Sequence, residues 1–155
     1  MKKYSLIIVP ITSILLSGCL SLTGNLSHDE IKQESNQEVV ERSYDEVSDK
    51  IIFWNDIFKQ IEDTYYVYLY SLSCSHCNSI KDYMIDKGLN NSVPIYFVSS
   101  SYEHNVATEG SVNVSTLSEL FIKGYPTLLK IESKMVIKNL AGVSLIKEEL
   151  SSKNI

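Results

Sequence analysis

A predicted strand that runs into two cysteines is the feature that most constrains this chain. Residues 65–72 are rich in aromatic and β-branched side chains, as strands are, and Cys74 and Cys77 follow just before a helical pattern. A cysteine that opens a helix lies near unpaired backbone N–H groups, which favour the thiolate over the thiol. Cys77 lies about one turn further along the same face, within reach of a disulfide with Cys74. The spacing therefore predicts a reactive dithiol.

The two residues between the cysteines bear on that reactivity. His76 can carry a positive charge and hydrogen-bond toward the Cys74 sulfur, and the Ser75 hydroxyl can add a weak donor. A stabilised thiolate favours the reduced form and makes the disulfide a stronger oxidant. The alternative is half of a zinc site, for which His76 and His104 are the plausible further ligands. The chain has no second CxxC and no HxxxH to complete such a site.

The N-terminus predicts export. Met1-Lys2-Lys3 is basic, and residues 4–16 form an apolar stretch that is short and interrupted for a membrane span but typical of a secretory signal. The following Leu16-Ser17-Gly18-Cys19 resembles the lipobox of bacterial lipoproteins. That resemblance implies cleavage before Cys19 and a lipid on its sulfur, which would anchor the chain to the cell membrane. A plain secretory signal or an uncleaved anchor is the alternative, and each predicts an extracytoplasmic chain.

Lipid on Cys19 would leave Cys74 and Cys77 as the remaining pair of three cysteines. A disulfide across so short a loop adds little stability, so in an oxidising compartment we interpret the pair as a working dithiol. Residues 1–18 contain two lysines and no acidic residue, so the 137 mature residues would carry 12 basic and 19 acidic side chains, a formal charge of −7. This charge argues against nucleic-acid binding and against electrostatic attachment to anionic lipid.

The chain divides into three predicted parts: a signal peptide (1–18), a lipid-anchored polar tether (19–49) and one α/β domain (50–155). In the domain we expect helices on both faces of a mixed sheet. The expected strands are 51–53, 65–72, 94–98, 127–131 and 135–140, and the expected helices begin at Asn55, Cys74, Ser115 and Ser144.

A second motif, Gly124-Tyr125-Pro126-Thr127, lies about fifty residues after the cysteines and precedes the predicted hairpin. In order and context the two motifs resemble the thioredoxin superfamily, whose members place CxxC after the first central strand and a cis-proline before the later hairpin. The resemblance covers residues 48–153 and implies a thioredoxin-like fold. It implies no cofactor. A trans proline that opens an edge strand is the alternative for Pro126.

The resemblance also implies residue roles. Cys74 would be the nucleophile and Cys77 the more buried resolving thiol. Pro126 would be a cis-proline packed against the disulfide, keeping metals from the sulfurs. The backbone of Tyr125 would pair with a substrate strand.

Two departures from the superfamily pattern are visible in the sequence. Tyr68 stands where thioredoxin has a buried aspartate, and Ser73 stands where it has a tryptophan. The Ser-His pair between the cysteines is similar to the x-His pairs of oxidising and isomerising members. We therefore expect a membrane-anchored, extracytoplasmic thiol-disulfide oxidoreductase that oxidises or isomerises cysteines of exported proteins and exchanges electrons with a membrane or extracytoplasmic redox partner.

Four alternatives remain open at this stage. The sequence is compatible with a thiol-disulfide reductase, and with a copper-handling lipoprotein that uses Cys74, Cys77 and a histidine. It is also compatible with an accessory protein for a secreted disulfide-containing peptide such as a bacteriocin. A non-catalytic thioredoxin-like binding module is the fourth, although the intact CxxC argues against it.

Overall fold

A computed structural model describes residues 41–100 and 105–151 of the 155-residue chain. All of them belong to one compact unit, Val39–Ile155. The predicted signal peptide, Cys19 and most of the predicted tether lie outside the described residues, as does His104. Within the described ranges, no helix combines the length and the apolar character that crossing a bilayer requires.

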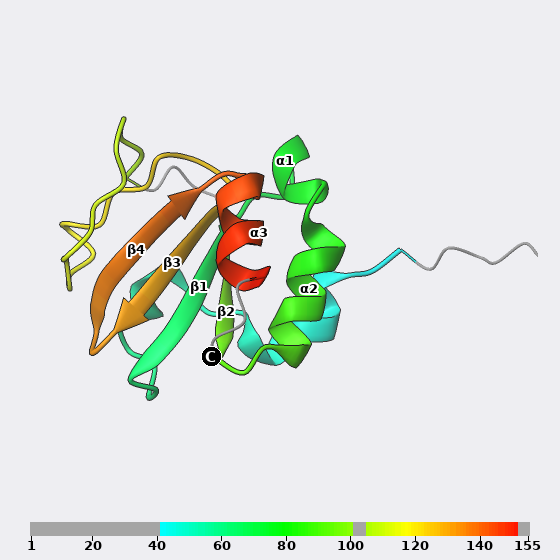
Figure 1. Cartoon of the computed structure of the whole chain (residues 1–155), viewed down its shortest axis with the longest axis horizontal. Coiled ribbons are helices and arrows are strands. Elements are labelled where there is room, and N and C mark those ends of the chain that lie inside the picture. Colours follow the sequence, from blue (N-terminus) through cyan, green and yellow to red (C-terminus); the bar gives the residue numbers. More distant parts are fainter. Residues whose placement is uncertain (1–40, 101–104, 152–155) are drawn as a thin grey trace, which may run out of the picture. The chain divides into compact units, whose positions relative to one another are not determined.

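A four-stranded mixed sheet forms the centre of the domain, in the order β2-β1-β3-β4 (Figure 1). Strand β2 runs parallel to β1, whereas β3 is antiparallel to both β1 and β4. A parallel pair extended by an antiparallel hairpin is the thioredoxin-like α/β arrangement, so the predicted fold class is confirmed. The strands are β1 (Thr64–Tyr70), β2 (Ile95–Ser99), β3 (Thr127–Glu132) and β4 (Met135–Ala141).

The alternation of side chains along β1 divides the core into two layers, because successive strand residues point to opposite faces. Tyr66, Tyr68 and Tyr70 belong to the layer that packs against the helices, and Tyr65, Val67 and Leu69 belong to the other layer. Figure 1 shows α2 and α3 on the same side of the sheet. The helices are α1 (Ser75–Asn78), α2 (Lys81–Asn90) and α3 (Val143–Ser151).

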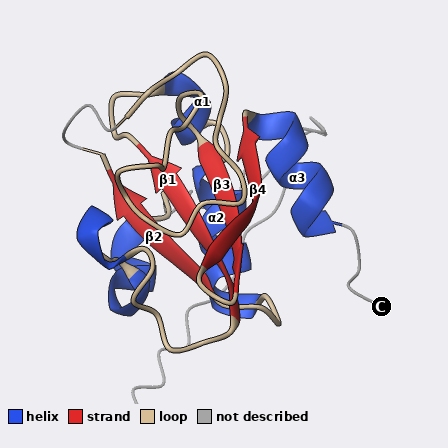
Figure 2. Ribbon diagram, turned by 90° about the vertical axis from the view of Figure 1, so that its left-hand side faces the viewer, coloured by secondary structure: helices blue, strands red, loops and turns tan. Residues whose placement is uncertain are grey.

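The opposite face is covered by irregular segments rather than by an α-helix, which corrects the expectation of helices on both faces (Figure 2). Leu120 and Ile122 are buried there, together with Ile57. The helix expected from Ser115 is wrong, because residues 117–119 form only a turn. This stretch is short and rich in Ser and Thr. Too few helical hydrogen bonds can form here to offset the unfavourable free energy of helix nucleation.

Three other elements differ from the sequence prediction. The predicted strand at 51–53 reduces to an isolated bridge between Ile51 and Phe97. The helix expected from Asn55 is a single 3-10 turn, η2 (Trp54–Asp56). The helix expected from Cys74 to about Gly88 is split in two, since Ile80 has φ −117° and ψ 1° and lies outside helical geometry.

The folded part of the chain begins earlier than the predicted boundary at residue 50. The 3-10 helix η1 (Tyr44–Lys50) starts at a capping box formed by Ser43 and Glu46. Tyr44 and Val47 of η1 are buried in the core layer that faces the helices. Residues that their composition assigns to the polar tether therefore contribute two side chains to the core. Because apolar residues are sparse in this segment, its composition does not indicate this burial.

Candidate active site

Cys74 lies at the point where β1 has ended and α1 begins. It is the N-cap residue of α1, and its sulfur accepts a hydrogen bond from the Cys77 backbone N–H at 3.2 Å. The N–H of Cys74 donates to the Ser71 carbonyl at 3.2 Å, which fixes the turn that leads out of the strand. The predicted strand, dithiol and helix start thus follow each other in the structure as they do in the sequence.

The two thiols differ strongly in exposure. Both are free thiols, Cys74 half-buried and Cys77 only 1% exposed. Burial, and then a hydrogen bond with the Cys74 sulfur, raise the pKa of the Cys77 thiol far above its usual range. Cys77 therefore stays protonated at neutral pH, and Cys74 is the sulfur that another molecule can reach.

The second sequence motif, residues 124–127, lies next to the Cys74 sulfur in the structure. The peptide bond between Tyr125 and Pro126 is cis, as predicted. The Tyr125 carbonyl oxygen lies 3.6 Å from the Cys74 sulfur, which donates a hydrogen bond to it. Pro126 is buried, and its carbonyl accepts a hydrogen bond from the Gly142 N–H at 2.9 Å. Gly142 has φ +98°, a conformation that favours glycine and that joins the end of the hairpin to this loop.

Ser75 and His76 lie on the exposed surface of α1. No hydrogen bond among the described residues joins either side chain to a cysteine sulfur; the backbone carbonyl of His76 accepts one from the Ser79 hydroxyl at 2.8 Å. The proposed influence of His76 on Cys74 therefore stays a prediction.

Two tyrosines that the sequence does not point to share the core layer of Cys77. The sequence marks Tyr68 only as a replacement for a carboxylate, and Tyr44 falls within the predicted tether. The Tyr44 ring stacks on the Tyr70 ring with the ring centroids 4.0 Å apart, and the Tyr68 ring is stacked with the Tyr70 ring at 5.8 Å. The alternating tyrosines of β1 were a usable signal, whereas only the capping box marked the segment that carries Tyr44.

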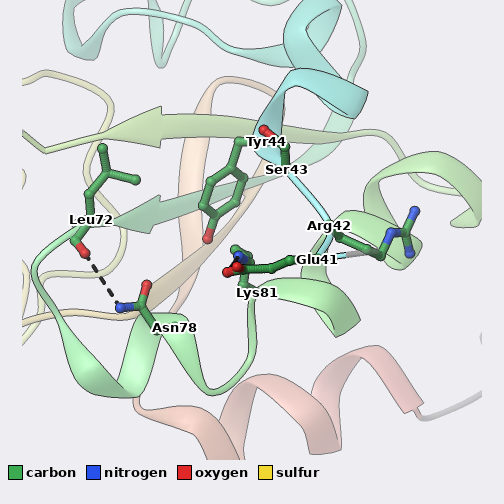
Figure 3. A pocket seen from close by; sticks show the side chains of 7 residues that line it. All are labelled: Glu41, Arg42, Ser43, Tyr44, Leu72, Asn78 and Lys81. Atoms are coloured by element: carbon green, nitrogen blue, oxygen red, sulfur yellow. Dashed lines mark hydrogen bonds and ion pairs between the residues drawn. The ribbon is translucent and has the colours of Figure 1, made fainter. Parts of the chain in front are cut away.

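A surface pocket of about 340 Å³ lies next to residues that flank the CxxC turn, and Figure 3 shows the side chains that line it. Leu72 lines it from the turn after β1, Asn78 from the residue after Cys77, and Tyr44 from η1. On the same rim, Lys81 forms an ion pair with Glu41 at 2.6 Å. The pocket thus joins the N-terminal segment to the two ends of the CxxC turn.

Among the residues that the structure describes, no three His, Cys, Asp or Glu side chains are grouped as a metal site would need. His104, one of the two further zinc ligands considered from the sequence, lies outside those residues. The described residues instead form a pair of sulfurs in which Cys74 accepts a hydrogen bond from the Cys77 N–H and donates one to the Tyr125 carbonyl.

Comparison with known proteins covered protein families, curated proteins and solved structures. No protein-family model and no curated protein matches this sequence. Among solved structures, one match is thioredoxin O2 from Arabidopsis thaliana in its oxidised state, with a TM-score of 0.41 and 11% sequence identity. The match covers 68% of this chain and 94% of that one.

Two cysteines brought together at a helix start, beside a mixed sheet of the order β2-β1-β3-β4, support thiol-disulfide oxidoreductase chemistry in general. One sulfur can be reached from solvent, and its partner is buried within the same turn. Such a pair can form a mixed disulfide at the first sulfur and release it through the second.

Proposed function

We propose that this chain is a lipid-anchored, extracytoplasmic thiol-disulfide oxidoreductase that acts on cysteines of exported proteins. The observation that carries the proposal is the setting of the Cys74 sulfur. It is bracketed by the Cys77 N–H at 3.2 Å and by the Tyr125 carbonyl, across the cis-proline loop, at 3.6 Å. Cys77, directly behind it, is buried, so the pair is divided into an attacked and a resolving sulfur.

In the oxidising direction, a substrate thiolate attacks the Cys74 sulfur of the Cys74–Cys77 disulfide. The bond between the two cysteines breaks, and Cys77 leaves with the electron pair. A second substrate thiolate then attacks the substrate sulfur of the mixed disulfide and releases Cys74 as a thiolate. The substrate gains a disulfide, and the protein becomes a dithiol.

In the reducing direction the same sulfurs act in reverse. The Cys74 thiolate attacks a substrate disulfide, and Cys77 then attacks Cys74 to release the reduced substrate. The preference for oxidation or isomerisation rests on the Ser75-His76 pair between the cysteines. A membrane or extracytoplasmic redox partner would restore the working oxidation state after each cycle.

The location rests on the sequence of residues 1–19. A basic start, an apolar stretch and Leu16-Ser17-Gly18-Cys19 favour export and lipid attachment at Cys19. Because the mature chain would be acidic, the lipid rather than surface charge would hold it at the membrane.

Trapping of mixed disulfides tests the proposal in cells. Cys77→Ala removes the resolving thiol, so substrates attacked at Cys74 should accumulate as covalent adducts that dissolve on reduction. We expect these adducts in the membrane fraction of bacteria that express the variant, detected on non-reducing gels and identified by mass spectrometry. Adding Cys19→Ser to the same variant should move them out of that fraction.

The matched control is the double variant Cys74→Ala Cys77→Ala, which should give no adducts. Folded Cys77→Ala protein that forms no adduct would contradict the proposed chemistry. Adducts that stay in the membrane fraction despite Cys19→Ser would contradict the lipid anchor alone.

A further inference from the structure

Four tyrosines lie on β1, and the hydroxyls of two of them have a clear hydrogen-bond partner. Tyr65 donates to the Ile57 carbonyl at 2.8 Å on the face away from the helices. Tyr66 donates to the Glu149 carboxylate at 2.9 Å. In the described part of the chain, the buried hydroxyl of Tyr68 has no hydrogen-bond partner of acceptable geometry, and neither has that of Tyr44. A buried polar atom without a partner is unfavourable and rare, so these two hydroxyls require an explanation.

The position of Tyr68 suggests one. It lies on the face of β1 that the helices cover, in the same core layer as Cys77 and Tyr44. The pKa of each hydroxyl responds to a hydrogen bond with the other, and a negative charge on either cysteine sulfur raises the pKa of both. Tyr68 thus carries a buried hydroxyl in the same core layer as the buried thiol.

The chemical state of these hydroxyls limits what they can do. Burial, as the largest cause, raises the pKa of Tyr68 and of Tyr44 far above the ordinary value. Both therefore remain neutral, and a neutral phenol donates a hydrogen bond rather than acting as a base. A neutral donor has little to offer a protonated Cys77, but it strongly favours a thiolate there, because hydrogen bonds to charged groups are the stronger ones.

We propose that the Tyr68 hydroxyl, backed by that of Tyr44, is the hydrogen-bond donor that stabilises the Cys77 sulfur as a thiolate during disulfide exchange. The inference rests on the proposed function. When a substrate thiolate attacks Cys74 in the disulfide, the bond between the cysteine sulfurs breaks and Cys77 takes the electron pair. Tyr68 donates to the resulting negative sulfur without losing its proton. In the reducing direction, the same contact favours the Cys77 thiolate that must attack Cys74.

Tyr44 extends the arrangement to the surface. Its side chain reaches from η1 toward the turn and helix that carry Leu72 and Asn78, and it lines the pocket next to residues that flank the CxxC turn (Figure 3). The two hydroxyls form a series within the core layer that holds Cys77.

The test compares two substitutions that each remove one hydroxyl from the same strand. Tyr68→Phe removes the proposed donor, and Tyr65→Phe is the matched control, since its hydroxyl lies on the other face. The full chain with Cys19→Ser is oxidised, and reduced glutathione is added. The loss of the Cys74–Cys77 disulfide is followed by acid quenching, alkylation and mass spectrometry, and urea unfolding of each variant is measured in parallel.

We expect Tyr68→Phe to slow reduction of the disulfide by about ten-fold or more, the usual effect of losing a hydrogen bond to a charged group. Tyr65→Phe should react at the wild-type rate even where it lowers stability, because it leaves the Ile57 carbonyl without its donor. Tyr44→Phe should give a smaller loss of rate than Tyr68→Phe. A purely structural role for Tyr68 would change unfolding and leave the exchange rate alone.

A Tyr68→Phe protein that exchanges within two-fold of the wild type overturns the inference and leaves the proposed function standing. A wild-type protein whose cysteines never form a reducible disulfide overturns both. If Tyr68→Phe does not fold, Tyr44→Phe decides the matter, since wild-type exchange in that variant contradicts the series of hydroxyls.

Discussion

Replacing Val47 by alanine tests whether residues 43–50 belong to the folded domain. Val47 is fully buried, in the core layer that also holds Tyr44 and Cys77. A side chain placed on Gly88 would come within 3.2 Å of the Val47 Cγ1, so η1 and α2 are closely packed at this point. If the segment were a solvated tether, as its composition suggests, shortening this side chain would change nothing.

The size of the effect follows from the carbons removed. Val47→Ala deletes two methyl-sized groups from a fully buried site, worth about 1.6 kcal/mol at ~0.8 kcal/mol each. The cavity left between helix and sheet adds to this loss, for a total of about 2–3 kcal/mol. With a urea slope of about 2 kcal/mol per molar, the midpoint of unfolding should fall by roughly 1 M.

The assay is urea unfolding of the full chain with Cys19→Ser under reducing conditions, followed by circular dichroism. Val112→Ala is the matched control, because Val112 lies in a loop and is 47% exposed. The control should stay within about 0.5 kcal/mol of the parent. If the urea midpoint of Val47→Ala coincides with that of Val112→Ala, η1 is not part of the core.

Two further predictions concern stability. Gly88→Ala should lower the free energy of unfolding by about 1 kcal/mol, because the added Cβ would lie 2.7 Å from the buried Phe97 ring. This clash outweighs the better helix propensity of alanine. Urea unfolding checks the prediction, and a stabilised variant would show that the Phe97 ring can move. Burial opposes the charge of Glu149, but hydrogen bonds from Lys138 and Tyr66 prevail and lower its pKa below the ordinary 4.5. The stability that this carboxylate contributes is therefore present above pH 4.5 and lost as the pH falls through the lower folded value. Glu149→Gln should lose less stability than the parent between pH 5 and pH 3, and equal losses would contradict the assignment.

The local parts of the site could be predicted from the sequence because each is encoded in adjacent residues. The strand before the cysteines, the dithiol at a helix start and the cis-proline loop are all present in the structure. The alternation of apolar residues also predicted the hairpin. The turn at Ser133 and Lys134 has positive φ at both residues. Glycine or asparagine would have indicated such a turn in the sequence, but serine and lysine do not.

What the sequence did not predict depends on tertiary packing. Tyr44 and Val47 lie in a polar stretch, and their burial depends on contacts with Tyr70, Phe97 and α2. The spacing of Leu117, Leu120 and Phe121 suggested a helix, but Leu120 is buried within a loop instead. The two partnerless hydroxyls could not be foreseen either, because a tyrosine in a strand gives no sign of what its hydroxyl meets.

The most direct test of the central claim is the redox equilibrium of Cys74 and Cys77. The full chain with Cys19→Ser is equilibrated in glutathione buffers of known ratio, and the thiols are trapped and counted by mass spectrometry. We expect a reversible disulfide with a reduction potential between about −120 and −180 mV, the range of oxidases and isomerases. A midpoint near −270 mV would reverse the proposed direction. Two cysteines that remain free thiols at every ratio would contradict the account itself.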